Sequence, residues 1–148
     1  MPALYPREPL SRPAACSRNL LRVTSPPTPR DLSGAWRVHT SDGDLARRFT
    51  DPSISDADWP EVPVPGHWQS TDAFAGNDGP MLYRRRFEGT PLEPGHRRFL
   101  TFDGIFYDGD IWLDGGYVGA TAGYFAPHTF EVTDQARHVP DDGHLLAV

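Results

Sequence analysis

Short runs in which apolar and polar residues alternate dominate the chain from residue 31 onward. In residues 81–87, Tyr83 and Phe87 fall on one side of an extended chain, and Arg84 and Arg86 fall on the other. The longest such run is residues 105–113: one side carries Ile105, Tyr107, Ile111 and Leu113, and the other carries Phe106, Asp108, Asp110 and Trp112. A period of two is the pattern of a β-strand, so both runs are predicted to be strands.

Shorter segments of the same kind complete a set of strands. Trp36 and Val38 alternate toward one face of a strand, and Trp36, Tyr83 and Phe102 are predicted to lie in the core. Further strands are predicted at residues 97–102, 117–119, 128–132 and 144–148. Residues 62–66 contain two prolines that cannot donate ladder hydrogen bonds, which favours an edge strand or a connector.

The segments between these strands carry turn signals. Asp114, Gly115 and Gly116 predict a tight hairpin turn. Residues 40–60 are polar, and Ser55 is predicted to cap one short helical turn before Trp59. Six or more strands with at most one helical turn predict an all-β sandwich.

The first 30 residues differ from the rest. Residues 1–30 hold seven of the 16 prolines and no glycine, and they show neither helical nor strand periodicity. They also hold five arginines and one acidic residue. The whole chain has a net charge of −6, so the remaining residues are strongly acidic. We therefore expect a disordered or extended segment at residues 1–30 and one β-sandwich domain at residues 31–148.

Charge and composition exclude several classes of function. An acidic folded part is poorly suited to binding phosphate backbones, so no nucleic acid is expected as a partner. No apolar stretch approaches a membrane span and no signal core is present, which predicts a cytoplasmic protein without a membrane partner. Cys16 is the single cysteine, which excludes an internal disulfide and a cysteine-based metal cluster. No cofactor is expected.

Several segments, taken in order, resemble one known domain. They are residues 59–69 (WPEVPVPGHWQ), 78–87 with LYRRRF, 102–119 (FDGIFYDGDIWLDGGYVG), 123–133 (GYFAPHTFEVT) and 143–148 (GHLLAV). This ordered set resembles the N-terminal sugar-binding domain of glycoside hydrolase family 2, which includes β-galactosidases, β-glucuronidases and β-mannosidases. The resemblance covers residues 31–148 and implies a jelly-roll sandwich of the galactose-binding-domain-like type.

The resemblance also implies where catalysis takes place. In the family, both catalytic glutamates lie on a later (β/α)₈ barrel, and the acid/base directly follows an asparagine. Here Asn19 and Asn77 are followed by Leu20 and Asp78, and a barrel of about 250 residues is not present. The chain is therefore expected to be non-catalytic by itself, a fragment or split gene product of an enzyme that hydrolyses O-glycosidic bonds. Its expected partner is carbohydrate or a glycosidase barrel, in the same chain or a separate one.

Candidate binding residues follow from the loops. Asn77 and Asp78, in the loop of residues 76–79, and Asp114 in the hairpin turn are the predicted carbohydrate-binding residues, because loops contact ligands more often than strands do. The family commonly has asparagine where Asp114 stands; both residues tolerate the turn, but a sugar contact through an amide is in question. Asp108, Asp110 and Asp114 could hold Ca²⁺, although a solvated sheet face explains them about as well, so no metal site is assigned.

Exposed aromatic residues would support a second reading of the chain. Trp59, Trp68, Trp112, Tyr124 and Phe125 are candidates for stacking on sugars, although most tryptophans in such sandwiches lie in the core. A stand-alone carbohydrate-binding module would need these rings at a preformed concave site. A sandwich that serves only protein–protein contacts would instead show an exposed apolar patch.

Overall fold

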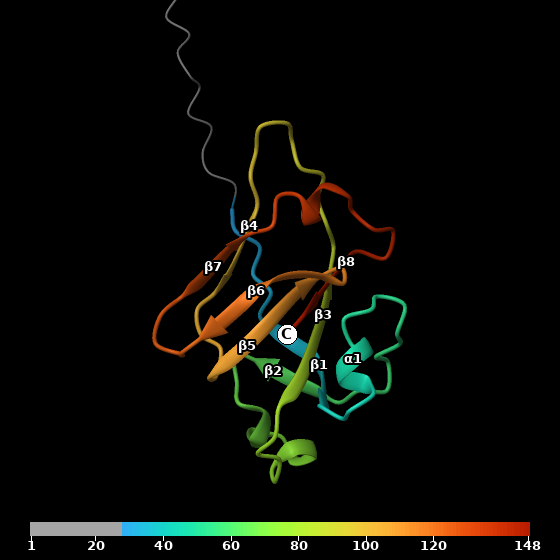
Figure 1. Cartoon of the computed structure of the whole chain (residues 1–148), viewed down its shortest axis with the longest axis vertical. Helices are drawn as coiled ribbons and strands as arrows, with labels where there is room; N and C mark the ends of the chain where they lie inside the picture. Colours follow the sequence, from blue (N-terminus) through green and yellow to red (C-terminus); the bar gives the residue numbers. More distant parts are fainter. Residues whose placement is uncertain (1–27) are drawn as a thin grey trace, which may run out of the picture. The chain divides into compact units, whose positions relative to one another are not determined.

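The computed structural model describes residues 28–148, and Figure 1 shows the chain coloured along its sequence. Asp31–Val148 forms one compact unit. The segment expected at residues 1–30 lies, except for its last three residues, outside the described part of the chain. None of the helices within residues 28–148 is long and apolar enough to cross a membrane.

Two antiparallel sheets make up the fold, a larger one with strand order β2-β1-β3-β8-β5-β6 and a smaller one formed by β4 and β7. The strands are β1 (Gly34–Thr40), β2 (Glu61–Val64), β3 (Met81–Phe87), β4 (Phe99–Phe102), β5 (Asp108–Leu113), β6 (Gly116–Ala122), β7 (His128–Glu131) and β8 (His144–Ala147). One short α-helix, α1 (Leu45–Arg48), and the 3-10 turns η1 (Trp68–Ser70), η2 (Asp72–Phe74) and η3 (Gln135–Arg137) complete the described elements. This architecture confirms the predicted all-β, jelly-roll sandwich of the galactose-binding-domain-like type.

The strand β8 lies in the middle of the larger sheet, although seven strands precede it in the sequence. Four residue pairs join it to β3, and two pairs, Trp112↔Ala147 and Leu113↔Leu146, join it to β5. All four of its residues are buried. β8 therefore connects the β2-β1-β3 half of the sheet to the β5-β6 hairpin (Figure 1).

The main core lies between the two sheets. Its buried members are Trp36, Val38, Val62, Phe74, Ile111 and Leu146, and Leu100, Phe102 and Phe130 of the smaller sheet pack against them. Alternation along β1 puts Trp36 and Val38 on the same face, as the sequence predicts. Tyr83 and Phe102 also pack against this core, which confirms their predicted place.

The opposite face of the larger sheet is partly covered by the segment between β1 and β2. Phe49 and Trp59 of this segment pack on Leu82 and Ala147, and Trp112 borders the same cluster. Arg84 lies beneath the segment and is fully buried. Its Nε is 3.4 Å from the Asp56 carboxylate, an ion pair between the sheet and this segment.

The hairpin turn has the backbone that its residues predict. Asp114 and Gly115 both have positive φ, 52° and 80°, and they join β5 directly to β6. Two successive residues with positive φ are typical of the tight turn that matches strand twist. The edge position of β2 is also as predicted from its prolines.

One local prediction is wrong. β5 begins at Asp108, not at Ile105, and Tyr107 is 57% exposed instead of sharing the buried face of Ile111 and Leu113. Residues 55–59 form the predicted turn, in which Ser55 Oγ accepts a 3.4 Å hydrogen bond from the Ala57 amide and the Trp59 amide donates to the Asp56 carbonyl at 3.1 Å. The α-helix α1 lies earlier in the same segment, and the Asp42 carboxylate accepts a 2.8 Å hydrogen bond from the Leu45 amide at its start.

Candidate functional site

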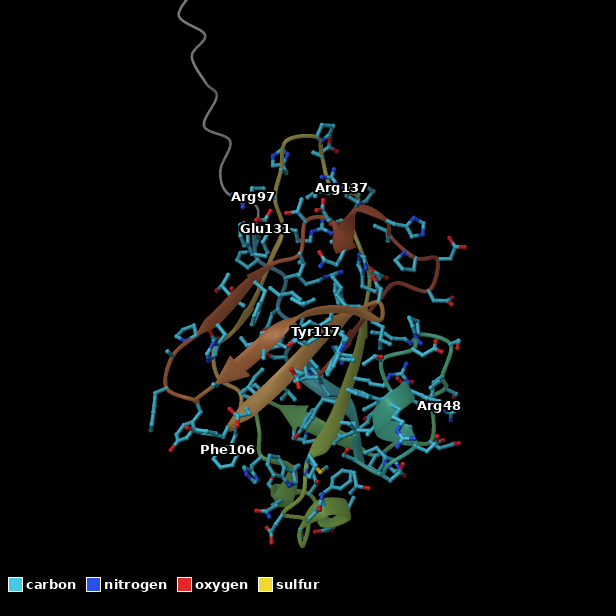
Figure 2. The ribbon with its side chains drawn as sticks, in the orientation of Figure 1. Arg48, Arg97, Phe106, Tyr117, Glu131 and Arg137 are labelled. Carbon is cyan, nitrogen blue, oxygen red and sulfur yellow. The ribbon has the colours of Figure 1, made fainter. Side chains whose placement is uncertain are left out.

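One end of the sandwich carries a continuous group of aromatic side chains. We call His67, Trp68, Phe106, Tyr107, Tyr124 and Phe125 the aromatic end. They come from three loops, the β2–β3 loop with η1, the β4–β5 loop and the β6–β7 loop. Figure 2 shows Phe106 projecting from the end of the molecule where η1 and η2 lie.

Ring contacts connect these six side chains. His67 stacks on Trp68 with ring centroids 4.1 Å apart, and Phe106 lies 5.7 Å from His67. Phe106 is also 5.5 Å from Tyr124, which in turn lies 6.0 Å from Tyr107 and 4.1 Å from Phe125. Tilted rings at such separations attract each other through their quadrupoles, so the group forms one surface instead of isolated side chains.

This surface is unusually open to solvent. Phe125 is 89% exposed, Phe106 61%, Tyr107 57% and Tyr124 42%. These four are most of the large apolar side chains exposed within residues 28–148. A contiguous exposed aromatic group marks a binding or contact surface far more often than scattered apolar residues do.

Polar groups hold the neighbouring loop in place. The indole Nε1 of Trp68 donates a 2.9 Å hydrogen bond to the Asn77 carbonyl, and Gln69 Nε2 donates to the same oxygen at 3.0 Å. Gln69 Nε2 also reaches Asp78 Oδ1 at 2.7 Å. The loop predicted to bind carbohydrate is therefore fixed to the aromatic end by η1.

Asn77 and Asp78 differ in what they offer to a ligand. The half-buried Asn77 uses its side chain inside the loop, because Oδ1 accepts from the Gly79 amide at 3.1 Å and Nδ2 donates to Met81 Sδ at 2.7 Å. Asp78 is exposed, and within residues 28–148 its carboxylate accepts a hydrogen bond only from the side-chain amide of Gln69. Of the two, Asp78 has the freer polar atoms.

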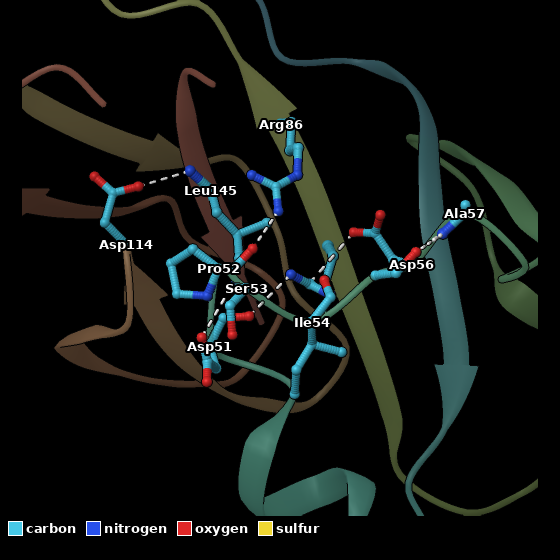
Figure 3. A network of polar contacts seen from close by, with 11 residues as sticks. Asp51, Pro52, Ser53, Ile54, Asp56, Ala57, Arg86, Asp114 and Leu145 are labelled. Atoms are coloured by element: carbon cyan, nitrogen blue, oxygen red, sulfur yellow. Dashed lines mark hydrogen bonds and ion pairs between the residues drawn. The ribbon is translucent and has the colours of Figure 1, made fainter. Parts of the chain in front are cut away.

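Asp114 lies at the other end of the sheet. Leu113, just before it, pairs with Leu146, which also pairs with Arg85 near the end of β3, while Asn77 lies before β3 begins. The Asp114 Oδ1 accepts a hydrogen bond from the Leu145 amide at 2.7 Å (Figure 3), and the Asp114 Oδ2 lies 2.6 Å from His144 Nδ1. The three predicted residues therefore do not form one site, and the predicted sugar contact of Asp114 remains a prediction.

The acidic residues of β5 do not converge either. Asp110 Oδ1 accepts a 3.0 Å hydrogen bond from the Tyr117 hydroxyl, and this bond raises the pKa of Tyr117 above its ordinary value. The Asp114 carboxylate instead contacts His144 and the Leu145 amide of β8. Within the described residues, no group of three or more His, Cys, Asp or Glu side chains could hold a metal ion.

The aromatic candidates divide between core and surface. Trp59 is buried on the outer face of the larger sheet, in the cluster with Phe49 and Leu82. Trp112 is half-buried against Phe49 and Tyr117. Tyr124 and Phe125 belong to the aromatic end, with the half-buried Trp68. The sequence reasoning missed Phe106 and Tyr107 because they continue the alternation of the following strand; the Asp103-Gly104 turn just before them was the available signal.

Comparisons with known proteins connect this sandwich to a family of enzymes. No protein-family model matches the chain. A β-galactosidase of Vibrio vulnificus is 26% identical over 139 residues, which cover 80% of this chain and 13% of that enzyme. The structure of a Faecalibacterium prausnitzii β-glucuronidase matches 80% of this chain and 20% of its own, with 23% identity and a TM-score of 0.64.

A third match carries the family in its name. The structure of a glycosyl hydrolase family 2 member from Bacteroides cellulosilyticus matches 78% of this chain with a TM-score of 0.62 and 24% identity. The chain resembles an N-terminal sandwich domain of glycoside hydrolase family 2. It spans about an eighth of the Vibrio enzyme and 17% of the Bacteroides chain, so the family 2 likeness concerns one domain's worth of residues.

Proposed function

We propose that the chain is the non-catalytic N-terminal sandwich of a family 2 type enzyme that acts on O-glycosidic bonds. Similarity to β-galactosidases and β-glucuronidases over a small share of their length supports this proposal. In this role the domain works together with a catalytic barrel, in the same chain or as a separate one. It contributes shape and contacts, and the barrel contributes the carboxyl pair that glycoside hydrolysis requires.

The aromatic end is the surface through which the domain works in this proposal. Its exposed rings would lose solvent on contact with the barrel, and burial of each large ring stabilises a contact by about 1.5–3 kcal/mol. Asp78 lies at the rim of this surface through its bond to Gln69. Asn77 and Asp78 are proposed to contact carbohydrate at this rim, and Asp114, which is bonded to β8 at the other end of the sheet, is a separate candidate contact.

Co-expression with the family 2 barrel encoded nearest to this chain tests the proposal. We expect the two to co-elute in size-exclusion chromatography and to hydrolyse p-nitrophenyl β-galactoside or β-glucuronide faster than the barrel alone. A Phe106→Ala, Phe125→Ala double variant should weaken co-elution and activity together. Phe99→Ala is the matched control, because Phe99 is 51% exposed but belongs to the smaller sheet.

A second candidate function is carbohydrate binding by the domain alone. The exposed rings of Tyr107 and Tyr124 and the exposed carboxylate of Asp78 favour it, since sugars pack on rings and bond to carboxylates. Titration of the isolated chain against a glycan panel separates the two candidates. Binding that is lost in Tyr124→Ala favours the module, and uniform silence together with barrel-dependent activity favours the enzyme domain.

A further inference from the structure

A hollow opens on the outer face of the larger sheet, away from the aromatic end. It measures about 240 Å³ and is lined by Ala35, Arg37, Asp56, Glu61, Arg84, Arg85 and Arg86. It lies where β1 leaves β3: β1 pairs with β3 from Arg37 onward, and its earlier residues pair with β2. Figure 3 shows residues 51–56 running along β3 beside Arg86.

The lining is strongly biased toward positive charge, with four arginines and two carboxylates in an otherwise acidic domain. Strand register puts Glu61, Arg37 and Arg84 in one row across β2, β1 and β3. Two residues further along β3, Arg86 continues the same face. Burial lowers the pKa of Arg84, nearby Asp56 opposes this shift, and Arg86 adds to it through repulsion.

Arg84 is fully buried and contacts other parts of the protein. Its guanidinium donates to the Ile54 carbonyl at 2.9 Å and to the Asp51 carbonyl at 3.2 Å, and its Nε faces Asp56. These bonds hold the segment before β2 against the sheet. Arg84 therefore has a structural role, and it is not a donor to a ligand.

The other arginines have N–H groups that are not used in hydrogen bonds within the described part of the protein. Arg37 donates to the Trp59 carbonyl and pairs with Glu61, while Arg86 donates to the Pro52 carbonyl at 2.6 Å. A guanidinium has five N–H donors, so Arg37 and Arg86 retain several each. Arg85 donates to the Ala35 carbonyl, and its buried Nε has no hydrogen-bond partner in the described structure.

We propose that this hollow binds a small oxyanion between Arg37 and Arg86. The anion accepts hydrogen bonds from the remaining solvent-facing N–H groups of these two side chains, and the half-buried Arg85 guanidinium, which also lines the hollow, adds positive potential. Planar guanidinium groups suit phosphate and carboxylate oxygens because two parallel N–H bonds can form. The bound charge offsets the repulsion between Arg84 and Arg86.

Thermal unfolding of the full chain in sodium phosphate, sodium acetate and sodium chloride at equal ionic strength tests the proposal. We expect phosphate to raise the melting temperature above its value in chloride, with saturation at a roughly millimolar dissociation constant. A response to acetate as well identifies a carboxylate site, and a response to phosphate alone identifies a phosphate site. Equal melting temperatures in all three salts would overturn the proposal.

Two arginine variants separate a local site from the overall charge. Arg86→Gln is expected to weaken the phosphate response about tenfold, since it removes one charge-assisted hydrogen bond. Arg137→Gln removes the same charge from an exposed residue outside the hollow and should leave the response unchanged. Equal losses in the two variants, or no loss in Arg86→Gln, would contradict a local site.

A measurement on the unaltered chain avoids any folding defect of the variants. In ¹H–¹⁵N spectra, phosphate should shift the Nε–Hε resonances of Arg37 and Arg86 and leave that of Arg137 in place. Uniform shifts of all three resonances, or none, would overturn the proposal.

Discussion

At the scale of single residues, the outer face of the larger sheet depends on one buried charge. Arg84 is fully buried, and it bonds two carbonyls and a carboxylate of a segment about thirty residues earlier in the sequence. The Arg84 guanidinium also lies over the Trp59 ring, with its Cζ 5.5 Å from the ring centroid. The Arg84 side chain thus holds the segment before β2 against the outer face of the sheet.

Replacing Arg84 with methionine should destabilise the domain. The variant keeps the length of the side chain but leaves Asp56 and two carbonyls without their donor, which costs about 3 kcal/mol. Urea denaturation measures the loss. Arg137→Met, which removes only an exposed pair, should change the free energy of unfolding by less than about 0.5 kcal/mol; a similar loss in both would show that burial is not the cause.

A second residue-scale prediction concerns Glu131 on β7. The Arg97 hydrogen bond, with help from Thr133, lowers the pKa of Glu131 from 4.5 to about 2. Because the folded-state pKa is depressed, the pair stabilises the fold above about pH 4.5, and this contribution is lost as the pH falls toward 2.

Carboxyl ¹³C titration tests this shift directly. In Arg97→Gln, the pKa of Glu131 should rise toward 4.5 and stay slightly below it, because the Thr133 hydroxyl still donates. Arg137→Gln should leave the Glu131 titration unchanged. A Glu131 pKa near 2 in Arg97→Gln would show that Arg97 does not cause the shift.

At the scale of elements, the hairpin turn and the central strand are fastened to each other. The Asp114 carboxylate accepts from the Leu145 amide and bonds His144, and the Asp114 amide donates to the Leu145 carbonyl at 2.8 Å. Since β5 and β8 share only two residue pairs, these bonds add substantially to the seam between the two halves of the sheet.

Three substitutions at Asp114 separate the turn from the fastening. Asp114→Ala removes both side-chain bonds and strains the positive φ, so it should cost about 3 kcal/mol. Asp114→Gly accepts the φ but loses the bonds, and Asp114→Asn accepts the φ and keeps an acceptor for Leu145. The expected order of stability from urea denaturation is aspartate, asparagine, glycine, alanine; alanine equal to wild type would contradict the fastening.

The same elements show what sequence can and cannot predict. Alternation located the strands and the Asp-Gly pair located the turn, because both signals depend on neighbouring residues. The bond between Asp114 and His144 joins residues thirty positions apart, and nothing local to either one indicates it. Phe106 and Tyr107 followed the alternation but lie in the loop before β5, so periodicity alone misplaced two members of the aromatic end.

At the scale of the whole molecule, the exposed surface is uneven. The aromatic end gathers most of the large apolar side chains exposed in the described residues, while the outer face is occupied by charged residues around Arg37 and Arg86. The two surfaces suit different contacts, one apolar and one ionic.

The aromatic end should dominate the self-association of the isolated chain. Phe125→Asp should reduce concentration-dependent association in sedimentation velocity and lower the fluorescence of bound anilinonaphthalene sulfonate. Because Phe125 is 89% exposed, the free energy of unfolding should change by less than about 0.5 kcal/mol. Phe99→Asp, at the smaller sheet, should have less effect on association; equal effects would argue against a localised surface.

The central position of β8 also determines when the larger sheet can form during synthesis of the chain. While a ribosome is still making residues 140–147, β2-β1-β3 and the β5-β6 hairpin have no strand between them, and each presents an open edge. The larger sheet can close only after Ala147 has left the exit tunnel. Until then the emerging domain offers two unpaired edges to chaperones or to neighbouring chains, and one four-residue strand ends that interval.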